Sequence, residues 1–155
     1  MALVVATLNS QLLNIVNNPV SFPSSYEEAG QIWSEAINAY ASLVTPPSVT
    51  SAVAQQAFVA AWIANKPSED LSILVSAISA YAASLALGMA PTFVGTPPLP
   101  VTEQALLAGL KSLGEAMLQA PDASVWSSTA STLIDTYFKT GVAVNSASGA
   151  TITWL

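Results

Sequence analysis

The side chains most able to do chemistry in this sequence are its nine acidic residues. The chain has no His and no Cys, and its three basic residues are all lysines, so acid and base chemistry would depend on carboxylates. Two carboxylates a few ångströms apart are the usual catalytic pair of glycosidases. The adjacent acids are Glu27 with Glu28 and Glu69 with Asp70, and the isolated ones are Glu35, Glu103, Glu115, Asp122 and Asp135.

Most of these acids have a structural explanation. Carboxylates at a helix start cap free N–H groups and lie favourably in the helix dipole. Three acids fall in the middle of predicted helices, and we interpret them as part of a solvated face: Glu35, Glu115 and Asp135. The other six lie at predicted helix starts: Glu27, Glu28, Glu69, Asp70, Glu103 and Asp122.

Other routes to catalysis lack the necessary residues. A serine nucleophile would need a base, and without His that base would be Lys66, Lys111 or Lys139, none of which lies in a recognisable motif. Metal sites usually need His, Cys or acids at calcium-loop spacing, and the glycines are isolated rather than grouped as in phosphate-binding loops. The sequence therefore predicts no catalytic, cofactor-binding or metal-ligating residue, and a protein that is not an enzyme.

The composition indicates a chain whose surface is covered by other proteins. Of 155 residues, 52% are hydrophobic and only 8% charged, against about 25% charged in an ordinary soluble domain. A surface with so few charges would be prone to aggregation unless neighbours cover it. The net charge of −6 excludes nucleic-acid binding, because phosphates need clustered basic residues. The amino terminus lacks a basic region before its apolar start, so we expect no signal peptide.

Prolines divide the chain into segments of helical length, which predicts a single mainly α domain over 1–155. It is expected to be a bundle of about five to six helices. The predicted helices cover 3–16, a segment from Ser25 with a capping box to Glu28, 49–64, a segment from Ser68, one from about 102, and one from Asp122 that Gly141 ends as a C-cap. The first of these could also begin as a strand.

Two segments do not follow the helical pattern. Residues 90–101 carry four prolines and are predicted to form a stiff, extended linker close to polyproline II. In residues 141–155 the apolar period changes from 3.6 to 2, which predicts a short β-hairpin or an extended arm. Such a tail either folds onto its own helices or is completed by another chain.

Aromatic residues give the other candidate positions. Trp33, Trp62 and Trp126 lie at helical spacing, which favours a place in the core over a ligand cleft. Trp154 lies at the end of the chain, where a large side chain is rarely buried unless the terminus docks on something. We therefore predict a protein-interaction site in the tail, made of Val142, Val144, Ile152, Trp154 and Leu155.

Residues 71–89 raise the alternative of a membrane-active protein. The stretch is uncharged and long enough to cross a bilayer, as in a holin-like lysis factor. Its serines, the lack of close basic flanks and the placing of its large residues on one side favour a buried helix, so membrane contact is not expected.

Three segments carry a resemblance to a known family: "NNPVSFPSSYEEAGQIWSEAINAYAS", "GMAPTFVGTPPLP" and "FKTGVAVNSASGATITWL". Together they resemble the small alanine-rich virion structural proteins of tailed bacteriophages, including cyanophages. The resemblance covers most of the chain as a pattern, and none of its motifs is catalytic.

The resemblance implies a non-enzymatic subunit of the virion, made in the cytoplasm of a host bacterium. Its partners would be other virion proteins and copies of itself, joined through apolar helix faces and the carboxyl-terminal tail. The lack of basic residues argues against contact with the packaged genome. A place in the tail, baseplate or neck is therefore expected, with a capsid decoration protein as the alternative.

Overall fold

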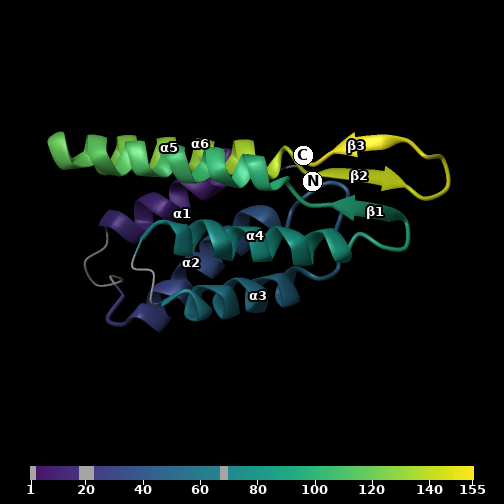
Figure 1. Cartoon of the computed structure of the whole chain (residues 1–155), viewed down its shortest axis with the longest axis horizontal. Helices are drawn as coiled ribbons and strands as arrows, with labels where there is room; N and C mark the ends of the chain where they lie inside the picture. The colour runs from purple at the N-terminus through teal and green to yellow at the C-terminus, as the bar shows by residue number, and fades with distance from the viewer. Residues whose placement is uncertain (1–2, 18–22, 67–69) are drawn as a thin grey trace.

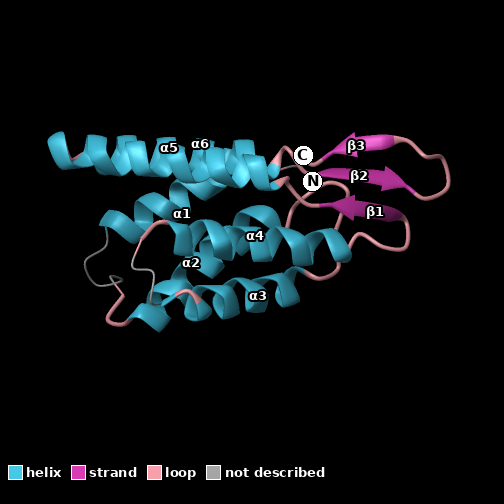
Figure 2. Ribbon diagram, in the orientation of Figure 1, coloured by secondary structure: helices cyan, strands magenta, loops and turns pink. Residues whose placement is uncertain are grey.

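The computed structural model describes residues 3–17, 23–66 and 70–155, which form a mainly α fold with a small antiparallel sheet at one end (Figures 1 and 2). The predicted fold class, a mainly α bundle of about five to six helices with a strand-like tail, is confirmed, and of the two forms left open for the tail the structure has the hairpin. The helices are α1 (Val5–Asn17), α2 (Tyr26–Ala41), α3 (Ser51–Ala64), α4 (Ser72–Leu87), α5 (Pro100–Gln119) and α6 (Ala123–Phe138). The strands are β1 (Phe93–Thr96), β2 (Val142–Asn145) and β3 (Thr151–Thr153), in the order β1-β2-β3.

Two predicted helix starts are confirmed in their capping contacts. The Ser25 hydroxyl accepts a hydrogen bond from the Glu28 N–H at 3.0 Å, and Asp122 accepts bonds from two N–H groups of the first turn of α6. The capping box is only half as predicted, because the Glu28 carboxylate accepts from Ser24 rather than from the Ser25 N–H. The Glu28 carboxylate therefore binds the hydroxyl and the N–H of Ser24, one residue before the N-cap whose N–H it would bind in a standard capping box.

Two other helix starts were predicted wrongly. α4 begins at Ser72, not directly after Ser68, and the Asp70 carboxylate accepts a hydrogen bond from the Ser72 N–H at 2.7 Å; Ser68 and Glu69 lie outside the described residues. α5 begins at Pro100, two residues before the predicted start. Proline is well suited to the first helical position, because that position needs no N–H donor.

The helices form a ring around an aromatic centre. Each helix packs on the next one along the chain, and α6 packs back on α1. The even-numbered helices place rings at the centre, where Phe138 of α6 meets Tyr40 of α2 at 5.7 Å and Tyr81 of α4 at 6.2 Å between ring centroids, both edge to face. The aromatic centre of the core therefore lies where α2, α4 and α6 face one another.

The α4 helix lies in this core. Its 16 residues include the predicted stripe of large side chains, of which Leu74, Ile78, Tyr81 and Leu85 are buried. Among the described residues, no helix is both long enough and apolar enough to cross a bilayer.

The proline-rich segment 90–101 is not a simple extended linker. Its middle forms β1, which pairs antiparallel with β2 in the register Val94 with Val144. Phe, Val and Thr favour strands, and the surrounding prolines hid that preference in the sequence. Polyproline II angles survive at Leu99, with φ −75° and ψ 154°, directly before α5.

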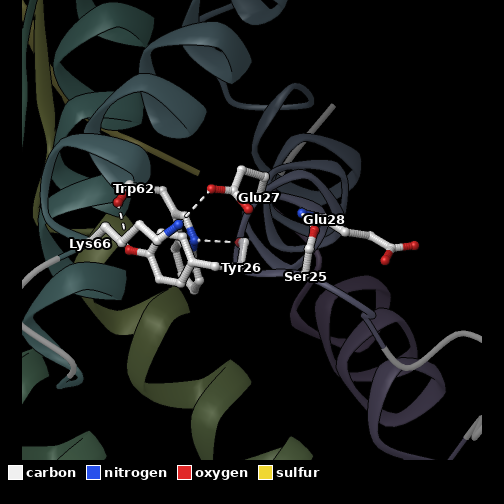
Figure 3. Close-up of polar contacts among 6 residues, drawn as sticks. All are labelled: Ser25, Tyr26, Glu27, Glu28, Trp62 and Lys66. Carbon is white, nitrogen blue, oxygen red and sulfur yellow. Dashed lines mark hydrogen bonds and ion pairs between the residues drawn. The ribbon is translucent and has the colours of Figure 1, made fainter.

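A reciprocal pair of hydrogen bonds holds the start of α2 to the end of α3 (Figure 3). The Tyr26 hydroxyl donates to the Trp62 carbonyl oxygen at 2.7 Å, and the Trp62 indole N–H donates to the Tyr26 carbonyl oxygen at 3.0 Å. Lys66 adds an exposed ion pair with Glu27 at 2.8 Å, which contributes little because water screens it. The Trp62 ring is thereby fixed across Gly30, where an added Cβ would lie 2.6 Å from its Cδ1 atom.

Gly30→Ala is expected to lower the free energy of unfolding by about 1–3 kcal/mol, because the added methyl group overlaps a ring that its hydrogen bond holds in place. Gly114→Ala is the matched control, since Gly114 also lies in a helix and nothing lies within 4 Å of its added Cβ. That control should raise stability by roughly 0.5–1 kcal/mol through helix propensity. Urea denaturation followed by circular dichroism measures both, and an equal effect of the two substitutions would contradict the packing at Gly30.

Candidate functional site

The three acids left in mid-helix have different surroundings. Glu35 and Glu115 are exposed, as the sequence predicts for a solvated face. Asp135 does not belong to such a face: it is buried, its carboxylate accepts a hydrogen bond from the Tyr40 hydroxyl at 2.7 Å, and it pairs with Lys139 at 2.8 Å. Neither partner is a second acid, so Asp135 has a structural role between α2 and α6.

No group of three or more metal-binding side chains gathers within the part of the chain that the structure describes. The acids that come nearest to a shared site line a notch between α1 and α2, where Glu28 and Glu35 lie beside Gln11 and Asn14. Both carboxylates accept local hydrogen bonds, Glu28 from Ser24 just before α2 and Glu35 from Gln31 within α2. The notch therefore carries the ordinary polar surface of two helices.

The predicted interaction site in the tail lies at the sheet end of the molecule, and its five residues have different positions. Trp154 is fully buried in its own chain: its indole N–H donates to the Val142 carbonyl oxygen at 3.1 Å, and its ring covers Gly141. Leu155 exchanges two backbone hydrogen bonds with Thr45, at 2.8 and 3.1 Å. The tail thus folds onto its own helices, which was one of the two arrangements left open by the sequence.

Gly141 has a different role from the predicted one. α6 ends with Lys139 as its C-cap, in a right-handed helical conformation, and Gly149 has the positive φ among the described glycines. An added Cβ at Gly141 would overlap the Trp154 ring. Glycine is needed at position 141 because the Trp154 ring lies where a Cβ atom would be. It is not the C-cap of α6 that the sequence predicted.

The pairing of the strands divides the other tail residues between the two faces of the sheet. Val142 and Val144 are half-buried on the outer face, where Val144 pairs with the exposed Val94. Ile152 pairs with Ala143, which is fully buried on the opposite face. The predicted alternation is confirmed as two strands, but the residues that share its apolar pattern do not share one surface, because the hairpin turn changes the register.

The outer edge of β3 is open at Thr151 and Thr153, and beyond them Leu155 pairs with Thr45. Trp154 donates its N–H to the Gly141 carbonyl oxygen at 2.9 Å. Hydrogen-bonded pairs alternate along antiparallel strands, so the backbone groups of Thr151 and Thr153 point away from β2. Within the described residues these two threonines have no partner on that side, and both are exposed. An open edge is a ready surface for another strand.

Charge is absent from the sheet and from α3 and α4, and the charged residues nearest to the sheet along the chain are Glu103 near the start of α5 and Lys139 directly after α6. Residues 36–65, 71–102 and 140–155 contain no charged side chain, and they include all of α3, α4 and the three strands. Large apolar side chains are nevertheless exposed there, among them Val49, Leu87, Val94 and Leu99. Figure 1 shows the sheet extending beyond the ends of the helices.

Three buried tyrosines have raised pKa values, which makes the stability of the core depend on pH. Burial raises the pKa of Tyr40, and the adjacent Asp135 carboxylate raises it further. Burial likewise raises the pKa of Tyr81, and that of Tyr137 to about 12. In the unfolded chain these phenols ionise near pH 10, so the stability that they contribute is complete below pH 10 and is lost as the pH rises above it.

The free energy of unfolding is expected to fall between pH 10 and 12, by about 1.4 kcal/mol per pH unit for each phenol that stays neutral only in the folded state. Tyr40→Phe removes one of these phenols, so the free energy of unfolding should fall less steeply with pH, by about 1.4 kcal/mol per pH unit. The reason is that burial and the hydrogen bond to Asp135 keep the Tyr40 hydroxyl neutral in the folded state. Urea titrations at several pH values measure the slope. An unchanged slope in Tyr40→Phe would contradict the buried pair.

Trp154→Ala is expected to lower the free energy of unfolding by about 3–5 kcal/mol, because it leaves a cavity under the hairpin. Leu155→Ala is the control, since its side chain is exposed and its backbone bonds to Thr45 remain; we expect a loss below about 1 kcal/mol. Urea denaturation measures both. Equal losses would show that Trp154 does not anchor the tail in its own chain.

No protein family, curated protein or solved structure matches this chain. Its function is therefore inferred from the residues and surfaces described above.

Proposed function

We propose that this protein is a non-enzymatic structural subunit of a tailed-bacteriophage virion, associated with the tail, baseplate or neck. The observation that carries the proposal is the uncharged sheet end, where exposed apolar side chains lie beside an open strand edge. A subunit covered by neighbours in a particle needs no charged shell on the covered side. Partners are other virion proteins and copies of the chain itself.

The carboxyl-terminal tail contributes to assembly in two ways. Trp154 holds the hairpin against the helices, which positions the outer face of the sheet. Val142 and Val144 on that face then contact the neighbouring subunit, together with the exposed Leu155 side chain beyond β3, while Ile152 lies on the opposite face. A strand from the neighbour can add to the edge at Thr151 and Thr153, as in other strand-addition complexes.

A capsid decoration protein is the second candidate. The net charge of −6 favours a position away from packaged DNA, which the outer capsid surface also provides. The holin-like alternative has less support, because α4 occupies most of 71–89 and buries its large side chains in the core.

Mass spectrometry of purified particles, from the phage whose genome encodes the chain, is expected to find the protein at a constant ratio to the other particle proteins. A double variant, Val94→Lys with Thr151→Lys, should reduce incorporation by at least tenfold, because it charges the outer face and the open edge. Leu118→Lys is the matched control, since Leu118 is 83% exposed near the far end of α5.

The two parts of the proposal fail separately. Absence of the wild-type chain from purified particles would remove the virion role. Normal incorporation of the double variant would leave that role in place and would remove the sheet end as the contact surface.

A further inference from the structure

The outer surface of α3 carries no charge and is largely apolar, with Gln55 and Gln56 as its larger polar side chains. The helix reads "SAVAQQAFVAAWIA", without one charged residue. A helix that is apolar all round is normally enclosed by protein, and α4 follows that rule at the centre of the core. Among the described elements α3 packs mainly on α2 and α4, it buries Ala54, Phe58 and Trp62, and it lies along the outer edge of the molecule in Figure 1.

The uncovered side forms one continuous stripe. Val53 is 55% exposed and Ile63 45%, and Val49, in the turn before the helix, is 86% exposed. A shallow groove runs beside this stripe against Gln31 of α2. The stripe consists of Val49, Ala52, Val53, Gln56, Val59, Ala60 and Ile63, of which Val59 is half-buried and the others exposed.

The stripe is symmetric about Gln56. Three residues to either side of it lie Val53 and Val59, and four residues to either side lie Ala52 and Ala60. The ends of the stripe are also alike, with Val49 and Ile63 seven residues away in each direction. Read backwards, the helix surface presents nearly the same side chains in the same order.

Such a surface is complementary to itself when one copy is turned end to end. We propose that α3 is the contact surface of a two-fold symmetric homodimer in which the two α3 helices pack antiparallel, with the two Gln56 side chains at the axis. Val53 then faces the partner's Val59 and Ala52 faces the partner's Ala60. The alanines let the backbones approach closely, and the two amides can hydrogen-bond to each other.

The distribution of charge favours this arrangement over a parallel one. A parallel pair would bring Lys66 of both copies together at the carboxyl ends of the helices, whereas the antiparallel pair separates them by about 30 Å, because Lys66 lies ten residues from the axis at Gln56 in each copy. Helix dipoles also oppose each other favourably in the antiparallel pair. Each copy carries a net charge of −6, so an uncharged face is the place where two copies can approach.

The area indicates a reversible dimer. A contact about 21 Å long and one helix diameter or more across buries roughly 800 Å² in total, less than the 1,200–2,000 Å² of stable complexes. Exposed Leu87 at the end of α4 and Gln31 on α2 are positioned to add to its margins. The association is therefore expected to be weak and to increase with protein concentration.

Single-cysteine variants test the geometry, because the chain has no cysteine of its own. Oxidised Gln56→Cys should form a disulfide dimer at least tenfold faster than Leu118→Cys, an exposed control on α5. A mixture of Val53→Cys and Val59→Cys should give the mixed dimer in preference to either homodimer. Preferred self-linking of Val53→Cys would indicate parallel packing and would overturn the antiparallel register.

Sedimentation velocity from 10 µM to 1 mM tests the dimer without crosslinking. The wild-type chain should associate with concentration, more tightly in high salt because salt screens the net charge of each copy. Gln56→Lys should weaken the association at least tenfold by placing two ammonium groups at the axis, while circular dichroism shows an unchanged melting temperature. A wild-type chain that is monomeric at 1 mM would overturn the proposal.

This dimer does not depend on the virion role. A chain that dimerises through α3 but is absent from particles would remove the proposed function and leave the dimer in place. A chain that is monomeric in solution but present in particles would remove the dimer and leave the proposed function in place.

Discussion

The hydrogen bond between the Tyr40 hydroxyl and the Asp135 carboxylate joins residues 95 positions apart, and the arrangement of the helices depends on it. A buried carboxylate is costly unless it is paired, so Asp135 requires both Tyr40 from α2 and Lys139 from its own helix. Phe138 is thereby placed between Tyr40 and Tyr81, where α2, α4 and α6 meet. The polar pair thus fixes the position of the rings around it.

From this centre the fold extends in two directions. α6 leads into β2, and Trp154 closes the hairpin over Gly141 while Leu155 pairs with Thr45 beyond α2. The sheet is consequently attached to the helices at both ends of the hairpin, and its free surfaces are the outer face and the edge of β3. On the other side, α3 packs on α2 and α4 by only part of its circumference. Both directions end in surfaces that are uncharged and apolar.

The two surfaces suit different kinds of contact. Backbone groups at a strand edge accept any extended segment, so specificity there comes from the side chains of the neighbouring face. The α3 stripe has no free backbone groups and depends on the order of its side chains, which is symmetric about Gln56. A small subunit with one self-complementary face and one strand-accepting end can build a repeated assembly.

The sequence by itself determined the helical segments, the caps at Ser25 and Asp122 and the terminal hairpin, because these depend on interactions within a few residues. It also determined that the chain has no His, Cys or Arg. Only the tertiary structure decided that Asp135 is buried, that β1 forms among the prolines and that Gly141 makes room for Trp154. Each of these requires a partner distant in the chain, and no local pattern identifies such a partner before the helices have packed.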